Sequence, residues 1–426
     1  MGQYFKVVPG RSINTHQAFG EIYLLNNDGT PWNPDEPARL VESLEAEASP
    51  FKAALNSLAP LDSLRAETMR LAFAPPPPQD FPTVTVIGTA ASTMTGTVLR
   101  EKRIGDNTAN GADLAADPRF RYSGTPSLDP TPADPTNFVQ APLIPGGASQ
   151  SAYYAFAVET ITASTNSEIE FRFRAPATGV SYRLQVDGRH YSMEVIRATG
   201  LAPGSWYYIR MAFPVARSRH IRLTLEGNVA FSGAKVPTGQ ELVRSPRPPA
   251  FPVAIIGDSF EGGAGLRPDG ATRMETASYL AALAMGADSI THLGLGGTGY
   301  TTANPYADRV AAAVAAAPQA VIVGGSRNDG TADTAGLRAA VDTVLAGLAS
   351  VPAVYVTGPS TVTFAGNNAA VKARTLAAGR GFVDALEDPW INTATMIGGD
   401  GIHLNWIGHQ RRASRLHEAI TALRAP

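Results

Sequence analysis

Ser259 and His403 have the residue types and settings of a nucleophile and its base. Ser259 lies in Gly257-Asp258-Ser259-Phe260, directly after a short apolar run, and His403 comes three residues after Asp400. A serine hydroxyl is a poor nucleophile unless a base takes its proton. A histidine can be that base when an aspartate holds the other nitrogen of its ring. We therefore predict that Ser259, His403 and Asp400 form a catalytic triad.

Two further segments could stabilise the oxyanion of a tetrahedral intermediate, which needs hydrogen-bond donors. The segment Gly294–Tyr300 (GLGGTGY) can turn backbone N–H groups toward a substrate. The side-chain amide of Asn328 can donate from Ser326-Arg327-Asn328-Asp329. Together with the triad, these donors predict acyl transfer through a serine nucleophile.

Each of these candidates also has a structural alternative. Ser259 could be the N-cap that opens a helix, and His403 could be a loop histidine. The glycines of Gly294–Tyr300 could be turn residues only. His409 is a rival base, but it falls within the final predicted helix. Asp258 is expected to hold the turn rather than to catalyse.

The elements that must position these residues are alternating strands and helices after residue 250. Continuous apolar runs are typical of buried parallel strands, and the runs here are Val253–Ile256, His292–Leu295, Ala320–Val323, Ala353–Val356 and Gly381–Val383. The predicted helices are Arg273–Met285, Tyr306–Ala316, Ala335–Ala349, Asn368–Ala378 and Trp406–Arg424. Repeated βα units favour a parallel sheet covered on both faces. In such sheets sites form where strands end and helices begin, which is where the candidate residues lie.

Residues 81–245 have a different pattern, in which apolar and polar residues alternate strictly. The alternating runs are Thr83–Ile87, Glu168–Arg174, Tyr207–Phe213 and His220–Leu225, and Val186-Asp187-Gly188-Arg189 is a predicted hairpin turn. This pattern predicts antiparallel sheets in a β-sandwich of jelly-roll type. The aromatic residues could contact a sugar or could fill the core of the sandwich: Tyr153, Tyr154, Trp206, Tyr207 and Tyr208.

Residues 1–80 form a separate piece, with a strand expected at Glu21–Leu25 and one or two helices within Pro37–Phe73. Pro75–Pro78 favours a semi-rigid polyproline II spacer. Ser245-Pro246-Arg247-Pro248-Pro249 is a second linker. We therefore predict three parts: 1–80, a β-sandwich at 81–245 and an α/β domain at 250–426.

Composition narrows the possible classes of protein. The 426 residues exceed what one core usually serves. A net charge of −2 gives no broad attraction to nucleic acid or anionic membrane. The absence of cysteine excludes disulfides and thiolate catalysis, and the seven histidines form no close ligand pair, so no metal is expected. The N-terminus has no pattern of a secretory signal, and no apolar stretch is long enough for membrane insertion.

The four candidate segments, in this order, resemble the blocks of the SGNH hydrolases, also called the GDSL-like esterases. The resemblance covers roughly Phe251 to Pro426. It implies a flavodoxin-like α/β/α fold that needs no cofactor. It also implies these roles: Ser259 as nucleophile and N–H donor, Gly297 as second N–H donor, Asn328 as side-chain donor, His403 as base and Asp400 as its orienting carboxylate.

Three residues near these blocks leave alternatives open. Ser326 stands where the family usually has glycine, although Gly324 and Gly325 precede it and could let the loop bend one residue earlier. Arg327 could contact an anionic or hydroxyl-rich substrate, or could face solvent. Tyr300 could line the substrate pocket or pack inside the domain.

A β-sandwich followed by an SGNH domain resembles the two-domain carbohydrate acetylesterases, and the whole chain resembles phage minor tail proteins. These resemblances imply removal of acyl groups, O-acetyl above all, from a cell-envelope polysaccharide by an enzyme of a virion or bacterial cell surface. Residues 1–80 would attach to other tail proteins or form a homo-oligomer. The alternatives are a lipolytic esterase or thioesterase, and a receptor-binding tail component without enzymatic activity.

Overall fold

The computed structural model describes residues 80–99, 119–123, 127–128, 139–140, 144–147 and 155–424, the last range with gaps at 164, 177–178, 193, 228, 246–250, 267–271, 360–361, 387–389 and 392. The chain divides into two compact units, Met1–Gln79 and Asp80–Pro426. The elements predicted for the first unit, at Glu21–Leu25, Pro37–Phe73 and Pro75–Pro78, lie outside the described residues, as do Tyr153 and Tyr154.

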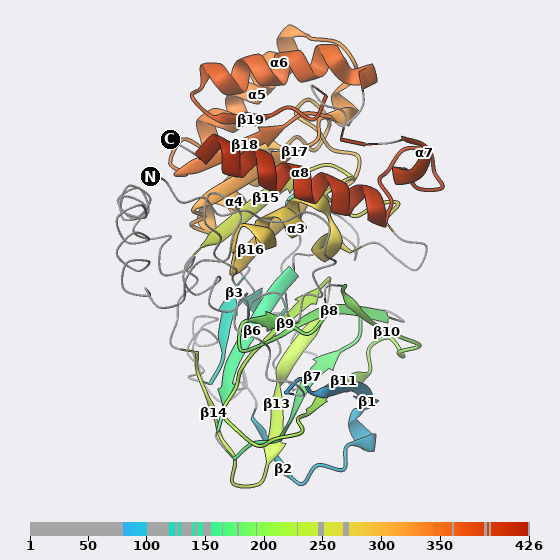
Figure 1. Ribbon diagram of the computed structural model, residues 1–426, viewed down its shortest axis with the longest axis vertical. Coiled ribbons are helices and arrows are strands. Elements are labelled where there is room, and N and C mark those ends of the chain that lie inside the picture. The colour runs from blue at the N-terminus through green and yellow to red at the C-terminus, as the bar shows by residue number, and fades with distance from the viewer. Residues whose placement is uncertain are drawn as a thin grey trace, which may run out of the picture. The chain divides into compact units, whose positions relative to one another are not determined.

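Two antiparallel sheets make up the first part of the unit Asp80–Pro426 (Figure 1). The first contains β1 Thr83–Gly88, β2 Gly96–Leu99, β4 Ser127–Leu128, β5 Val139–Gln140, β7 Glu168–Arg174, β11 Trp206–Ala212 and β13 Ala230–Pro237, in the order β1-β11-β7-β13-β5-β4 with β2 on β13. The second contains β3 Arg121–Ser123, β6 Ala155–Thr162, β8 Gly179–Val186, β9 Arg189–His190, β10 Ile196–Thr199, β12 His220–Glu226 and β14 Leu242–Val243, in the order β10-β8-β12-β6-β14 with β3 on β6 and β9 on β8.

The predicted antiparallel sheets are therefore confirmed, while the jelly-roll connection stays a prediction. The hairpin turn is confirmed as well. β8 ends at Val186 and β9 begins at Arg189. Between them Asp187 (φ 53°) and Gly188 (φ 79°) both have positive φ, as a two-residue turn of type I′ requires.

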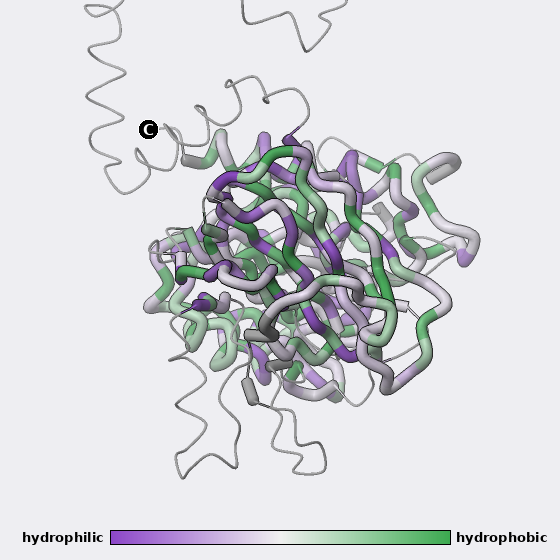
Figure 2. Tube along the Cα trace, turned by 90° about the horizontal axis from the view of Figure 1, so that it is seen from below, coloured by the Kyte–Doolittle hydropathy of each residue, from purple (hydrophilic) through white to green (hydrophobic). Residues whose placement is uncertain are grey.

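Alternation along the strands explains how the sheets bury one face. Figure 2 shows short hydrophobic and hydrophilic stretches alternating along the described chain. In β7 the side chains of Ile169, Phe171 and Phe173 are 0% exposed, whereas Arg172 and Arg174 are half-buried. The apolar set faces the core of the sandwich, as expected for two sheets packed face to face.

The predicted aromatic residues that the structure describes pack against the sandwich itself. Tyr208 is buried. The ring of Tyr207 stacks on Phe173 with 5.9 Å between centroids. The guanidinium of Arg172 lies 4.2 Å from the centroid of the half-buried Trp206 ring. These contacts favour the packing alternative over an open sugar-stacking surface.

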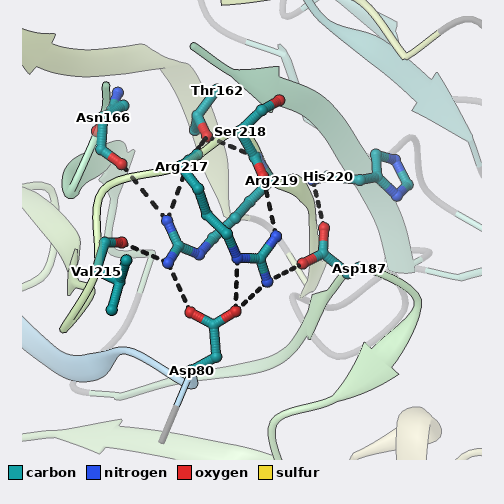
Figure 3. Close-up of polar contacts among 9 residues, drawn as sticks. All are labelled: Asp80, Thr162, Asn166, Asp187, Val215, Arg217, Ser218, Arg219 and His220. Atoms are coloured by element: carbon teal, nitrogen blue, oxygen red, sulfur yellow. Dashed lines mark hydrogen bonds and ion pairs between the residues drawn. The ribbon is translucent and has the colours of Figure 1, made fainter. Parts of the chain in front are cut away.

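A cluster of charges holds the start of this unit to the sandwich (Figure 3). Asp80 pairs through Oδ1 with Arg219 at 2.6 Å and accepts from Nε of Arg217 at 2.6 Å. Arg217 also reaches Asp187 at 2.7 Å. Burial would raise the pKa of Asp80, but the hydrogen bonds from Arg217 and Arg219 lower it overall. Residue 80 is thus fixed where the chain enters the sandwich.

The second part is an α/β domain with a five-stranded parallel sheet. Its strands are β15 Pro252–Gly257, β16 Ser289–Gly294, β17 Ala320–Gly324, β18 Ala353–Thr357 and β19 Gly381–Val383, in the order β16-β15-β17-β18-β19. This is the 2-1-3-4-5 order of flavodoxin-like sheets. The side chains of Val253, Ile255 and Ile256 are at most 1% exposed, because helices cover both faces. The predicted parallel sheet is confirmed.

The helices of this domain are α3 Ala277–Ala284, α4 Ala307–Ala315, α5 Ala335–Gly347, α6 Ala365–Ala377, α7 Thr393–Met396 and α8 Trp406–Arg424, with 3₁₀ turns η4 Arg273–Glu275, η5 Arg327–Asp329 and η6 Val362–Phe364. α3 packs on α8, whereas α5 packs on both α4 and α6. Right-handed crossovers between parallel strands place these two groups on opposite faces of the sheet. In Figure 1, α8 crosses in front of the sheet.

One local prediction was wrong, and one structural alternative is excluded. The helix predicted over Arg273–Met285 is η4 followed by the shorter α3, because Thr276 between them is extended (φ −72°, ψ 159°). Ser259 also opens no helix, which removes the N-cap alternative. Residues 258–266 form successive turns instead. Gly263 (φ 78°) and Gly265 (φ 71°) adopt the left-handed conformation there, which a right-handed helix cannot accommodate.

Candidate active site

The structure brings Ser259, His403 and Asp400 into one chain of hydrogen bonds. Ser259 Oγ lies 2.8 Å from Nε2 of His403, and Nδ1 of His403 lies 2.6 Å from Oδ2 of Asp400. An ionised aspartate can only accept, so Nδ1 carries the proton of the neutral ring and Nε2 can accept from the serine hydroxyl. This is the arrangement in which a histidine can take the proton of a serine.

Asp400 is held as an anion by three hydrogen bonds. Besides the His403 ring, the backbone N–H groups of Ile402 and His403 donate to its Oδ1 at 2.9 and 3.0 Å. The hydrogen bond from the His403 side chain, followed by these two, lowers the pKa of Asp400 to about 2. The carboxylate is therefore charged at neutral pH although its side chain is 42% exposed.

A short hairpin presents the Asp400–His403 segment. Ile397 bridges Leu404, and the N–H of Gly398 donates to the carbonyl of His403 at 2.7 Å. A Cβ on Gly265 would come within 2.6 Å of the His403 Cβ. Because Gly265 has no side chain, the turn that follows Ser259 can pass close to the side chain of His403. Sequence reasoning missed this residue, because it reads as an ordinary turn glycine.

Asn405 links this hairpin to α8. Its Oδ1 accepts from the N–H of Gly408 at 3.0 Å, which is an N-cap at the start of the helix. Its Nδ2 donates to the carbonyl of Thr395 at 2.9 Å. The N-cap at Asn405, which is a local feature of the sequence, therefore helps to fix the hairpin that carries His403.

The turn that carries Ser259 is held by its neighbour Asp258, as predicted for that residue. Asp258 is fully buried, and its Oδ1 accepts from the N–H of Phe260 at 2.9 Å. Burial raises its pKa to about 6, against the effects of that hydrogen bond and of Arg412. Its carbonyl accepts from the N–H of Gly262 at 2.9 Å.

The segment Gly294–Tyr300, which was predicted to supply an oxyanion donor, passes close to Ser259 at Gly296. A Cβ on Gly296 would lie 3.8 Å from that of Ser259, and Gly297 (φ 73°) is exposed with open space above it. Within the described part of the chain, the N–H groups of Ser259 and Gly297 donate to no protein atom. Asn328 donates one N–H to the carbonyl of Thr298 at 2.8 Å. Its amide has a second N–H, which remains available for an oxyanion.

Asp329 holds the segment Gly294–Tyr300 in place. Its carboxylate accepts from the N–H groups of Tyr300 and Thr301 at 2.8 and 2.6 Å. A Cβ on Gly299 would come within 2.5 Å of this carboxylate, so only glycine fits there. Both residues of the Asn-Asp pair thus bond to this part of the chain: Asn328 bonds to Thr298, and Asp329 bonds to Tyr300 and Thr301.

Arg309 is one of two buried charged residues that sequence reasoning missed, and Glu261 is the other. Arg309 donates through Nη1 to the carbonyls of Gly257 and Leu293, both at 2.9 Å, and through Nη2 to Oγ1 of Thr298 at 2.9 Å. It therefore joins two strand ends to the glycine segment.

Glu261 lies over a row of glycines at three strand ends. The register pairs Gly257 with both Gly294 and Gly324. A Cβ on any of these glycines would come within 2.3 to 3.0 Å of Glu261. Burial would raise the pKa of Glu261, but His292, Arg412 and Ser278 lower it to about 2. The glycine row was the only sequence signal for this buried anion.

Ser326 adopts a left-handed backbone conformation that favours glycine. Its φ is 96°, a left-handed value that is uncommon for a residue with a Cβ. The hydroxyl donates to Oδ1 of Asn367 at 2.7 Å, and the N–H donates to the Tyr306 hydroxyl at 3.2 Å. These bonds offset the backbone strain and keep the loop before Asn328 in the glycine-like path.

The remaining predicted residues lie as follows. Tyr300 is 3% exposed with its ring centroid 4.8 Å from that of Tyr306, which favours packing over substrate contact. The guanidinium of Arg327 lies 5.0 Å from the centroid of the Phe364 ring and is half-buried. His409 is buried, and its Nδ1 accepts from the N–H of Ala277 at 3.1 Å. Burial lowers the pKa of His409 to about 3, so it is too weak to be a base at neutral pH.

Among the residues that the structure describes, no group of three or more His, Cys, Asp and Glu side chains could hold a metal ion. None of the described helices is long and apolar enough to cross a membrane.

No protein-family model matches this chain, and no curated protein matches it. Solved structures do match. A family two carbohydrate esterase from Clostridium thermocellum in complex with cellohexaose is 16% identical with a TM-score of 0.53, over 71% of this chain and 98% of that chain. A family two carbohydrate esterase from Cellvibrio japonicus is 13% identical with a TM-score of 0.53, over 80% and 98%.

A salicylyl-acyltransferase from a tetracycline biosynthetic pathway is 16% identical with a TM-score of 0.54, over 72% of this chain and 96% of that chain. At such low identities the likeness shows the fold alone. The chain therefore has the fold of these enzymes, in which an α/β domain follows antiparallel sheets.

Proposed function

We propose that this protein is a serine esterase in which Ser259 is the nucleophile, His403 the base and Asp400 the residue that orients the base. The observation that carries the proposal is the hydrogen-bond chain from Ser259 to His403 at 2.8 Å and from His403 to Asp400 at 2.6 Å. The fold shared with carbohydrate esterases supports it.

In the first half-reaction Nε2 of His403 takes the Ser259 proton as Oγ attacks the acyl carbon. The carbonyl oxygen becomes an oxyanion, which accepts from the N–H groups of Ser259 and Gly297 and from the Asn328 amide. Asp400 stabilises the imidazolium that forms. When the intermediate collapses, His403 gives its proton to the leaving alcohol, and the acyl group remains on Ser259.

In the second half-reaction water replaces the alcohol. His403 takes a proton from water as the water oxygen attacks the acyl-enzyme carbonyl, and the same donors stabilise the second oxyanion. Collapse releases the carboxylic acid and returns the proton to Ser259. No step needs a metal or an organic cofactor to balance its atoms and electrons.

The proposed substrate is an O-acetyl ester of a carbohydrate. Its support is the likeness to two carbohydrate esterases, one of them in complex with cellohexaose. The role as a virion component, with residues 1–80 as an attachment region, also remains a proposal. It is not needed for the chemistry, and those residues are almost wholly outside the described part.

Hydrolysis of 4-nitrophenyl esters from acetate to long acyl chains tests the proposal, with the intact protein and with Ser259→Ala. Ser414→Ala is the matched control, because Ser414 lies on the exposed face of α8 and bonds to Glu418. We expect the acetate to be the best ester, with activity lost in Ser259→Ala only. Preference for long chains would instead favour a lipolytic esterase. Activity that survives in Ser259→Ala would contradict the proposal.

A further inference from the structure

The turn η4 is one of the places where the second sandwich sheet contacts the α/β domain. Arg183 of β8 donates through Nε and Nη2 to the carbonyl of Met274 at 3.1 and 2.9 Å. Arg197 of β10 pairs with the fully buried Glu275 at 2.5 Å. All three residues of η4 are buried. The sandwich therefore holds this turn by directed polar contacts rather than by loose packing.

Glu226, the last residue of β12, holds the first residue of the turn. Its Oε1 accepts from the backbone N–H of Arg273 at 2.6 Å and lies 3.7 Å from Nη1 of that arginine. Its Oε2 accepts from the hydroxyl of Thr272. Burial lowers the pKa of Arg273, and the Glu226 carboxylate opposes that shift. Glu226 thus supplies the countercharge that keeps a buried guanidinium in one place.

Arg273 in turn reaches the glycine segment of the candidate site. Its Nε donates to the carbonyl of Gly294 at 3.1 Å. The N–H of Leu295, at the other end of the same peptide unit, donates to the carbonyl of Gly257 at 3.0 Å. The peptide plane between Gly294 and Leu295 is therefore held from two sides. Arg273 bonds to its carbonyl, and its N–H bonds to Gly257, which lies at the strand end that leads into Ser259.

The orientation of this peptide plane sets the direction in which the chain continues along the glycine segment Gly294–Tyr300. Gly297 lies two residues after Leu295, and a Cβ built on Gly296, between them, would lie 3.8 Å from the Ser259 Cβ. A rotation of the plane would therefore move the N–H of Gly297 relative to the nucleophile. Misplacement of catalytic groups by about 1 Å can lower a rate by about 100-fold.

We propose that Glu226 and Arg273 are positioning residues, through which the sandwich aims the N–H of Gly297 at the oxyanion. Turnover would then depend on the sandwich through Glu226, and not on its other contacts with η4. This inference rests on the proposed function, because it needs an oxyanion to form at Ser259.

Three variants test the inference through kcat and KM for 4-nitrophenyl acetate and through thermal unfolding. Arg273→Met breaks the contact with Gly294, and Glu226→Gln removes the countercharge while keeping the shape. Arg197→Gln is the matched control, since it cuts a contact to the same turn without reaching the glycine segment. We expect kcat to fall about tenfold or more in Arg273→Met, and less in Glu226→Gln, with KM nearly unchanged. In Arg197→Gln we expect kcat to stay within about twofold of the wild type although its Tm falls.

A second readout needs no ester turnover: the rate at which a fluorophosphonate labels Ser259, followed by intact mass. Oγ bonds to phosphorus, fluoride leaves, and the proton goes to Nε2 of His403, while the phosphonyl oxygen takes the oxyanion position. We expect labelling to slow about tenfold in Arg273→Met and to be unchanged in Arg197→Gln. Wild-type rates in Arg273→Met, or equal slowing in both variants in step with their Tm, would overturn the positioning role alone. A wild-type chain that is neither labelled nor active would contradict the proposed function itself, and the inference with it.

Discussion

Two regions flank Ser259, one partly exposed to solvent and one buried. The first is the catalytic hairpin, Asp400–His403, in which three donors lower the pKa of an exposed aspartate to about 2. The second is the buried cluster, which comprises Asp258, Glu261, His409 and Arg412. There burial raises the pKa of Asp258 to about 6. The surroundings of an aspartate, rather than its residue type, therefore set its role. In the hairpin Asp400 stays ionised and orients His403, whereas in the buried cluster Asp258 holds the turn that carries Ser259.

The two histidines differ in the same way. His403 lies between Ser259 and Asp400 with its side chain 18% exposed. His409, six residues later, is buried against the first N–H of α3. Burial keeps it neutral by lowering its pKa to about 3. One histidine is therefore built to exchange protons and the other to cap a helix.

The largest expected effect separates these histidines. His403→Ala should lower kcat for 4-nitrophenyl acetate by about 10⁴-fold or more, with little change in Tm, because it removes the base from a position that is only partly buried. His409→Ala should lower Tm by several degrees through a lost cap and a cavity, while kcat falls less than about tenfold. Steady-state kinetics and thermal unfolding of both variants check this. A His409→Ala variant that folds but has lost its activity would contradict this difference in role between the two histidines.

The next effect concerns the oxyanion donors. Asn328→Ala should lower kcat by about 10²- to 10³-fold with KM little changed, because the amide acts on charge that develops in the transition state. Asn328→Asp, of nearly the same shape but unable to donate when ionised, should lose at least as much. Near-normal kcat in either variant would show that Asn328 is not a donor to the oxyanion.

The buried cluster should also affect stability as a function of pH. Asp258 binds its proton more tightly in the folded state (pKa about 6) than in the unfolded state (3.8). Its contribution to stability is therefore present below pH 3.8 and is lost as the pH rises through about 6, by roughly 3 kcal/mol. Asp258→Asn cannot titrate. The unfolding free energy of the wild type minus that of the variant should thus fall between about pH 4 and 7 in denaturant titrations. A difference that rises over this range would contradict the assignment of a raised pKa.

The smallest effect is expected for replacement of Arg327. The guanidinium of Arg327 lies over Phe364, and no carboxylate pairs with it among the described residues. Arg327→Gln should change kcat/KM for 4-nitrophenyl acetate by less than about twofold, since this ester has no anionic group to contact. For an acetylated acidic oligosaccharide KM should rise, whereas Arg338→Gln, which only breaks an exposed pair with Asp333, should change nothing. Equal behaviour of both variants would favour the solvent-facing alternative.

Much of the α/β domain could be predicted because its signals are local. Continuous apolar runs mark buried parallel strands, and β19 and α8 have the predicted bounds. The triad could be found for the same reason: Ser259 follows a strand directly, and Asp400 and His403 share one hairpin. The break at Thr276 could not be predicted, because η4 is fixed by sandwich residues such as Glu226, which are distant in sequence.

The support behind the site was also hidden from the sequence. Glu261 and Arg309 are charged residues without a motif, and their partners are carbonyls and glycines brought together only by strand register. Gly257, Gly294 and Gly324 look like turn glycines until the register aligns them beneath Glu261. Sequence patterns thus predicted the groups proposed to react but not the buried residues that hold them.

In the proposed mechanism Ser259 carries the acyl group during turnover. The most direct measurement mixes the protein with 4-nitrophenyl acetate, quenches in acid within the first turnovers, and maps the peptides by mass. We expect one acetyl group on the peptide that contains Ser259, and none on the same peptide of Ser259→Ala. Steady turnover with no acetyl group at Ser259, or with the acetyl group on another residue, would contradict it.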